Sequence, residues 1–159
     1  MSNIIRLTEN DRDKLRLVRK SLINLRSCYP EFGNWFDTKI TPNILSGSRE
    51  VFLATNNFEF SGALILKNTK HEKKICTLFI DENKRYNHLG LDLIRIASEE
   101  LETYKLPITI SSESINLFNN SQSFNFYQIE KRKDMYKQGL DEYIGYLMFH
   151  DPDSKLKRS

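Results

Sequence analysis

Residues 75–101, ICTLFIDENKRYNHLGLDLIRIASEEL, decide the fold, because a strand pattern gives way to a polar, cationic loop and then directly to a helix pattern. Residues 75–80 are almost continuously apolar or β-branched, which is typical of a strand buried on both faces. From Leu89 the apolar residues recur at helical spacing, and the charged residues fall largely on the other face. The stretch therefore predicts a strand, an anion-binding turn and a helix.

The first turn of that helix suits a phosphate or pyrophosphate. A helix N-terminus leaves about four backbone N–H groups without intrahelical partners and carries the positive end of the helix dipole. Arg85 adds a fixed charge, Gly90 permits close approach to the backbone, and the N–H groups of residues 87–91 can converge on an anion. The alternative is an exposed strand-to-helix connection with an incidental arginine.

This stretch resembles the acyl-CoA-binding motif, Arg/Gln-x-x-Gly-x-Gly/Ala, of the GNAT superfamily of acyl-CoA-dependent N-acyltransferases. Arg85 and Gly90 match its first and last positions, and His88 stands where its first glycine is usual. The resemblance implies acetyl-CoA as co-substrate, with its pantetheine arm on the backbone of Phe79 and Ile80, where two parallel strands splay apart. It also implies a pyrophosphate loop made of Arg85, Tyr86, Asn87, His88, Leu89, Gly90 and Leu91.

The composition is that of one globular domain, expected over residues 1–150 and followed by a polar tail at 151–159. The chain has 159 residues, of which 39% are hydrophobic and 28% are charged. Its net charge of +3 permits an acidic partner but falls short of the dense basic patch typical of nucleic-acid binders. Cys28 and Cys76 have no CxxC partner, which indicates reduced thiols. Without a signal-peptide pattern or an apolar run of about 20 residues, we expect a cytoplasmic protein with no membrane segment.

Spacing also argues against other chemistries. His71, His88 and His150 form no HxxxH pattern, so no metal site is predicted. The sequence has no Gly-x-Ser-x-Gly elbow and no Walker sequence, so nothing in it supports a hydrolase or a nucleoside triphosphatase.

Around the central stretch, the pattern predicts an α/β chain of the α+β type, a GNAT-like fold with a central mixed sheet flanked by helices. A strand at residues 2–7 precedes an amphipathic helix that ends near Ser27. After the central helix, a strand at residues 107–111 must return parallel to the 75–80 strand through a right-handed connection. A ligand cleft is then expected beyond the carboxyl ends of these two strands.

The other predicted elements are shorter. Residues 51–55 and 58–67 form a hairpin about Asn56-Asn57, which extends the 75–80 strand into an antiparallel meander. The rest of the chain is expected to form a short helix at 114–121 and two strands at 124–136 and 139–148, joined at Lys137-Gln138 with Gly139.

The aromatic segment at residues 28–36, CYPEFGNWF, either plugs one end of the core or lines a substrate groove. Trp35, the only tryptophan, has the large apolar body that proteins use most often for packing. The GNAT resemblance implies instead that this segment forms one wall of the acceptor site. A wall made of Tyr29, Phe32, Trp35 and Phe36 would suit a flat or aliphatic acceptor.

The resemblance implies an N-acetyltransferase that moves an acetyl group from acetyl-CoA to a primary amine of a small molecule, peptide or protein. The reaction needs a base for the amine and an acid for the leaving thiolate, and positioning supplies much of the rate. Many GNAT enzymes use a tyrosine in the helix after the fifth strand as the acid, but the nearest residue here is Phe118. We therefore predict Tyr136 as the acid, Tyr127 as a weaker candidate and Glu113 as the base; the alternatives are ordinary strand tyrosines and an exposed carboxylate.

Two rival functions stay open. His88 and Phe118 suggest a catalytically weakened GNAT fold that binds CoA or a protein partner as a regulator. The basic charge, the residues 131–133 (KRK) and the lysine-rich tail suggest a toxin that acetylates aminoacyl-tRNA. Alternating strand residues face opposite ways, however, which separates Arg132 from its lysine neighbours and makes a continuous phosphate track unfavourable. Binding to tRNA is thus not favoured, and a homodimer is neither required nor excluded.

Overall fold

The computed structural model describes residues 2–25, 29–81, 88–111, 115, 118 and 124–149. Within these residues, one mixed sheet has the strand order β1-β2-β3-β4-β5-β7-β6, and only the β4–β5 pair is parallel. This confirms the predicted mixed sheet. The strands are β1 (Ser2–Arg6), β2 (Arg49–Asn56), β3 (Glu59–Asn68), β4 (Lys73–Ile80), β5 (Lys105–Ser111), β6 (Phe124–Lys137) and β7 (Leu140–Phe149).

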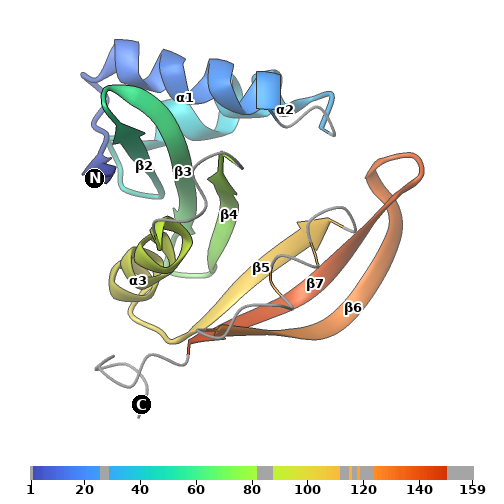
Figure 1. Ribbon diagram of the computed structural model, residues 1–159. Helices are drawn as coiled ribbons and strands as arrows, with labels where there is room; N and C mark the ends of the chain where they lie inside the picture. The colour runs from blue at the N-terminus through green and yellow to red at the C-terminus, as the bar shows by residue number, and fades with distance from the viewer. Residues whose placement is uncertain are drawn as a thin grey trace.

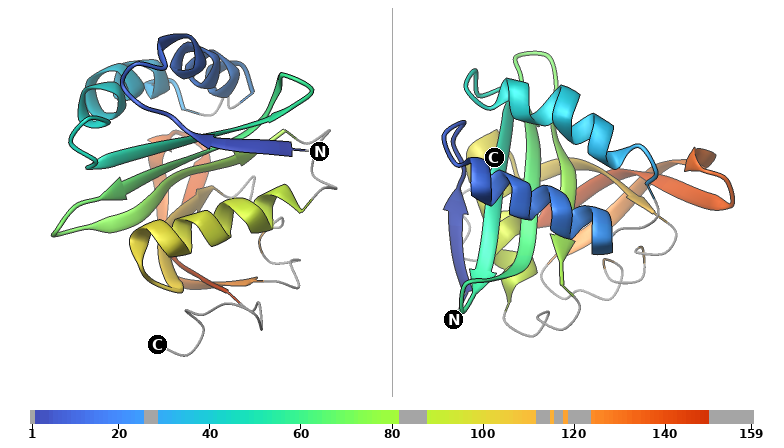
Figure 2. Two further views of the ribbon diagram at one scale, coloured as in Figure 1. Left: turned by 90° about the vertical axis from the view of Figure 1, so that its left-hand side faces the viewer. Right: turned by 90° about the horizontal axis from the view of Figure 1, so that it is seen from above.

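Helices cover both faces of the first half of the sheet (Figures 1 and 2). On one face lie α1 (Arg12–Leu25) and α2 (Phe32–Trp35), which continues into two irregular helical turns, η1 (Phe36–Ile40) and η2 (Thr41–Asn43). The predicted helix α3 (Leu89–Leu101) lies on the other face. Each helical layer covers its own apolar core, because alternate side chains of β2, β3 and β4 point to opposite faces of the sheet. Those on one face pack against α1 and α2, and those on the other pack against α3.

The start of α1 follows from its sequence. Asp11 comes directly before the helix and accepts a 2.7 Å hydrogen bond from the backbone N–H of Thr8. This bond and a second from the Thr8 hydroxyl hold the pKa of Asp11 below its usual value. The buried Leu15, Val18 and Leu22 recur at the predicted helical spacing.

The β2–β3 turn differs from its prediction by one residue. Asn57 and Phe58 both have positive φ, 52° and 68°, so they form the turn, and β3 begins at Glu59. Placing Phe58 in the strand was therefore wrong. A two-residue hairpin loop needs two left-handed residues to match the twist of its strands, and this requirement overrides the strand propensity of phenylalanine. Phe58 is accordingly 99% exposed.

The remaining boundaries shift by small amounts. The last hairpin turns at Gln138 and Gly139, which has φ 83°, so Gly139 belongs to the turn and not to β7. Strand β5 starts two residues before Pro107, and β1 ends at Arg6 rather than residue 7. Of the predicted helix at 114–121, only Ile115 and Phe118 are described, and both are helical. The predicted tail at 151–159 lies outside the described residues.

The sheet opens between its two parallel strands. β4 and β5 share one register pair, Ile75 with Ile108, whereas β5 pairs with β7 along the whole of Lys105–Ser111. Figure 1 shows β5, β7 and β6 turning away from β4. This divergence is the one that the GNAT resemblance implies.

Candidate active site

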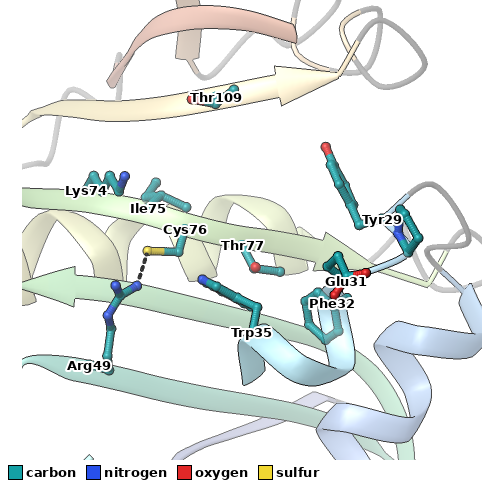
Figure 3. Close-up of a pocket in the computed structure, with 11 residues that line it drawn as sticks. Tyr29, Glu31, Phe32, Trp35, Arg49, Lys74, Ile75, Cys76, Thr77 and Thr109 are labelled. Carbon is teal, nitrogen blue, oxygen red and sulfur yellow. Dashed lines mark hydrogen bonds between the residues drawn. The ribbon is translucent and has the colours of Figure 1, made fainter. Parts of the chain in front are cut away.

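A pocket of about 440 Å³ lies where the sheet opens, on the face covered by α1 and α2 (Figure 3). Its walls come from four places in the sequence: residues 29–32 together with Trp35, Arg49 at the start of β2, residues 74–77 of β4, and Thr109 of β5. A volume of this size is within the range of small-molecule sites.

A β-bulge shapes the floor of the pocket. Ile65 and Leu66 are adjacent in β3, but they pair with Thr77 and Ile75, so Cys76 is an extra residue in β4. A bulge interrupts the alternation of side chains between the two faces. Cys76 and Thr77 therefore both line the pocket, although they are neighbours in the sequence (Figure 3).

The aromatic segment both lines the pocket and packs in the core. Tyr29, Phe32 and Trp35 line the pocket, and Trp35 also packs against the α1-side core with its ring 5.4 Å from that of Phe32. Phe36 is only 1% exposed and lies in that core, so including it in the wall was wrong. Helical geometry explains why Trp35 lines the pocket and Phe36 does not, because neighbouring residues of a helix point in different directions.

Tyr29 also connects the α1–α2 segment to the far half of the sheet. Its hydroxyl donates a 2.8 Å hydrogen bond to Oε1 of Glu142, a residue of β7 that is 1% exposed and pairs with Ser111 of β5. The sequence analysis missed Glu142. Its signal is an acidic residue at an otherwise apolar position of a strand, between Leu140 and Ile144.

Arg49 and Cys76 meet at the other end of the pocket. Nη1 of Arg49 donates a 3.1 Å hydrogen bond to Sγ of Cys76, and the guanidinium carbon lies 6.0 Å from the centre of the Trp35 ring. Burial raises the pKa of the Cys76 thiol, and the positive charge of Arg49 acts in the opposite direction but does not cancel this effect.

We therefore expect Cys76 to react slowly with iodoacetamide. A raised pKa leaves less thiolate at pH 8, so its alkylation should be at least about threefold slower than that of a small free thiol, and the rate should still rise above pH 9. Mass spectrometry of peptides separates Cys76 from Cys28. Unfolding in urea should remove the difference; a rate that levels off below pH 8 in the folded protein would contradict the raised pKa.

The predicted cofactor residues gather at the carboxyl end of β4. Phe79 and Ile80 end the strand and pair on one side with Ala63 and Gly62 of β3. Leu89, Gly90 and Leu91 form the first turn of α3, which packs close to this end: a Cβ added to Gly90 would lie 2.8 Å from Cδ1 of Ile80. The other loop residues, Arg85, Tyr86 and Asn87, lie outside the described residues.

His88 occupies the N-cap position of α3 with φ 55° and ψ 19°. This is the left-handed region, which glycine adopts freely and histidine adopts more often than most other residues. The departure from the GNAT motif is thus compatible with the backbone conformation. The His88 carbonyl accepts the first hydrogen bond of the helix, 3.0 Å from the N–H of Asp92.

The predicted catalytic residues are not brought together within the described part of the chain. Glu113 lies outside it, and Tyr136 is described only as a backbone position of β6. Tyr127 is 47% exposed and is not among the pocket residues. Phe118 packs against Phe124 with ring centres 6.0 Å apart and contacts the α3-side core, which gives its apolar ring a structural role.

Neither a metal-binding cluster nor a membrane-spanning helix occurs in the described residues. No group of three or more His, Cys, Asp or Glu side chains there is placed to hold a metal ion. No helix in the same residues is long and apolar enough to span a membrane. The absence of a metal and the cytoplasmic location stay predictions.

The combination of a mixed sheet, a single parallel pair that diverges and a helix N-terminus at its carboxyl end defines the fold of the GNAT acyltransferases. Solved structures agree. A GNAT-family protein from Desulfovibrio desulfuricans has a TM-score of 0.71 and 14% identity, with 95% of this chain and 100% of that chain covered. The ribosomal-protein-S18-alanine N-acetyltransferase from Escherichia coli has a TM-score of 0.64 and 15% identity, with 98% and 97% covered. An N-acetyltransferase from Staphylococcus aureus has a TM-score of 0.64 and 20% identity, with 92% and 96% covered.

This chain therefore has the GNAT fold, as its central motif predicted. No protein-family profile matches the sequence. No curated protein matches it either. At these identities the likeness establishes the fold alone, and the activity has to be argued from the site.

Proposed function

We propose that this protein is an N-acetyltransferase that moves the acetyl group of acetyl-CoA to a primary amine. One observation carries the proposal: β4 and β5 diverge after a single register pair, and the opening has a helix N-terminus at one end and a pocket on the opposite face. Such an opening gives two substrates separate approaches to one point. Positioning of this kind supplies much of the rate of a two-substrate reaction.

The described residues fit a CoA-type ligand. An added Cβ at Gly90 would lie 2.8 Å from Cδ1 of Ile80, so glycine lets the first turn of α3 pack against the end of β4. The free N–H groups of such a turn suit an anion. Residues 85–91 would hold the pyrophosphate, and the backbone of Phe79 and Ile80 would pair with the pantetheine arm. Neighbours of known structure include complexes with CoA and with a bisubstrate analogue, which supports this assignment.

The chemistry then needs two proton transfers. A neutral amine attacks the thioester carbonyl, the C–N bond forms, the C–S bond breaks, and the thiolate takes up a proton. We assign the acid to Tyr136 and the base to Glu113. The direct test of the function is release of free thiol from acetyl-CoA with pooled amines, peptides and charged tRNA as acceptors.

Replacing Tyr136 with phenylalanine should lower kcat about 100-fold and leave CoA affinity nearly unchanged. The variant loses the proton donor but keeps the ring, and a positioned acid is worth about this factor. Thiol release measures kcat, and calorimetry measures CoA binding. Tyr127→Phe is the matched control and should keep its activity. Unchanged turnover in Tyr136→Phe would remove this residue from the mechanism.

The same assay separates the two rivals. Wild-type protein that binds acetyl-CoA but releases no thiol with any acceptor would favour the regulator. The tRNA acetyltransferase gains no support from β6, where Lys131 lies 3.4 Å from Asp141 and Arg132 lies 3.0 Å from Glu130. These carboxylates already compensate two of the charges that an RNA backbone would have to use.

A further inference from the structure

The charges at the amino end of β4 do not balance. Glu72 forms ion pairs with both Lys67 and Lys74, and the hydrogen bond from Lys67 lowers the pKa of Glu72. Arg49 lies beside this group, because it pairs with Lys67 in the β2–β3 ladder. One carboxylate thus faces three cations, which leaves an excess of positive charge at this end of the pocket.

Arg49 is the cation in this group with the poorest partner. Among the described residues its guanidinium forms no ion pair, and the one hydrogen bond of its side chain there goes to the Cys76 thiol, a weak acceptor. A guanidinium has five N–H donors in a planar fork that matches a carboxylate or a phosphate. Since the fork also lies over the Trp35 ring, it is held in place before any ligand binds.

The opposite end of the pocket has a different character. Figure 3 shows Tyr29 and Glu31 toward the carboxyl end of β4, Arg49 and Lys74 toward its amino end, and Thr77 between them. The carboxylate of Glu31 suits an ammonium group, and β4 and β5 diverge at the same end. The pocket is thus acidic where an amine would meet acetyl-CoA and basic where the rest of an acceptor would lie.

We propose that the pocket selects amine acceptors that carry an oxyanion, a carboxylate or a phosphate, which binds Arg49 while the amine lies near Thr77. This inference rests on the proposed function and specifies its substrate class. Arg49 reaches Cys76, the residue directly before Thr77, and Lys74 lies two residues further back along β4. At about 3.3 Å per residue, the span from amine to oxyanion is therefore between about 3 and 10 Å. Acceptors with roughly four to six atoms between amine and oxyanion fit that span.

The first experiment measures binding without turnover. Trp35 is the only tryptophan and lines the pocket beside Arg49, so its fluorescence reports occupancy. We would titrate 4-aminobutanoate and 6-aminohexanoate against butylamine and hexylamine, in buffer without phosphate. The aminocarboxylates should bind at least about 10-fold more tightly than the amines of equal length. Adding 2-aminoethyl phosphate shows which oxyanion is preferred.

Variants assign this preference to Arg49. Arg49→Ala should bring the ratio of the two affinities to about one, and Arg49→Lys, which keeps the charge but loses the fork, should give an intermediate ratio. Arg16→Ala is the matched control, because Arg16 is an exposed arginine of α1 paired with Asp13 and not part of the pocket. It should keep the wild-type ratio. Circular dichroism checks that each variant is folded.

The outcomes separate this inference from the proposed function. Thiol release with equal efficiency for neutral and anionic amines would support the acetyltransferase and overturn the oxyanion site. Selective fluorescence binding that depends on Arg49, without thiol release from any acceptor, would establish the oxyanion site and overturn the transfer function. Equal affinities in the wild-type protein, or a preference that survives in Arg49→Ala, would also overturn the inference.

Discussion

Replacing Gly90 with glutamate is expected to weaken acetyl-CoA binding at least about 10-fold, because charge-assisted hydrogen bonds to an anion are worth about 1.5–3 kcal/mol. The new side chain would enter the first turn of α3, where even an added Cβ would lie 2.8 Å from Cδ1 of Ile80. Its negative charge would repel the pyrophosphate from the positive end of the helix. Calorimetry gives the dissociation constants of both proteins.

The matched control for this experiment is Leu45→Glu. Leu45 is 76% exposed and follows η2, and its neighbour Ile44 lies in the core on the α1 side of the sheet rather than in the α3-side core. The Leu45→Glu variant adds the same residue and charge away from the predicted loop, so its affinity for acetyl-CoA should equal that of the wild type. If a folded Gly90→Glu protein binds acetyl-CoA as tightly as the wild type does, the pyrophosphate site lies elsewhere.

Replacing Gly145 with alanine is expected to destabilise the second half of the sheet. A Cβ at this position would overlap the carbonyl oxygen of Tyr127 and approach Cα of Gln128 to 3.1 Å. These are backbone atoms of β6, so relief requires the strands to separate. Overpacking of this kind costs about 2 kcal/mol or more. For a chain of this length, the melting temperature should fall by roughly 4–8 °C.

Thermal and urea unfolding, followed by circular dichroism, measure this loss. Gly47→Asn is the control, since Gly47 has φ 80° but no atom within 4 Å of an added Cβ. Asparagine tolerates the left-handed region, so the control should change stability by less than about 1 kcal/mol. A Gly145→Ala protein as stable as the wild type would mean that β6 and β7 pair in another register.

Local sequence signals determined most of the fold. The change from a continuous apolar run to helical spacing predicted β4 and α3, and turn residues predicted the hairpins within one or two residues of their observed bounds. The parallel return of β5 followed from the handedness of strand–helix–strand connections. These signals are reliable because residue spacing and turn residues depend only on neighbours along the chain, and the handedness of a strand–helix–strand connection is general. None of them depends on a contact between side chains that are distant in the sequence.

Local sequence signals did not predict which residues line the pocket. Sequence spacing marked the aromatic segment but could not separate Trp35, which lines the pocket, from Phe36, which lies in the core. That choice depends on how the helical turns at residues 32–40 are rotated against the sheet. Rotation about the helix axis is decided by packing against other elements, which lie far away in the sequence.

By itself, the sequence determined the order of strands and helices and the parallel pairing of β4 with β5, and the resemblance to the GNAT family implied that this pair diverges. The CoA loop at residues 85–91 stays a prediction. Only the tertiary structure decided that Arg49, Cys76 and Thr77 share a pocket. The bulge at Cys76 exists through pairing with β3, and it turns two successive side chains to one face. Arg49 comes from another strand, and the excess of positive charge around it depends on which carboxylates lie within reach. Both are contacts between distant segments, and the spacing of residues along one chain does not encode them.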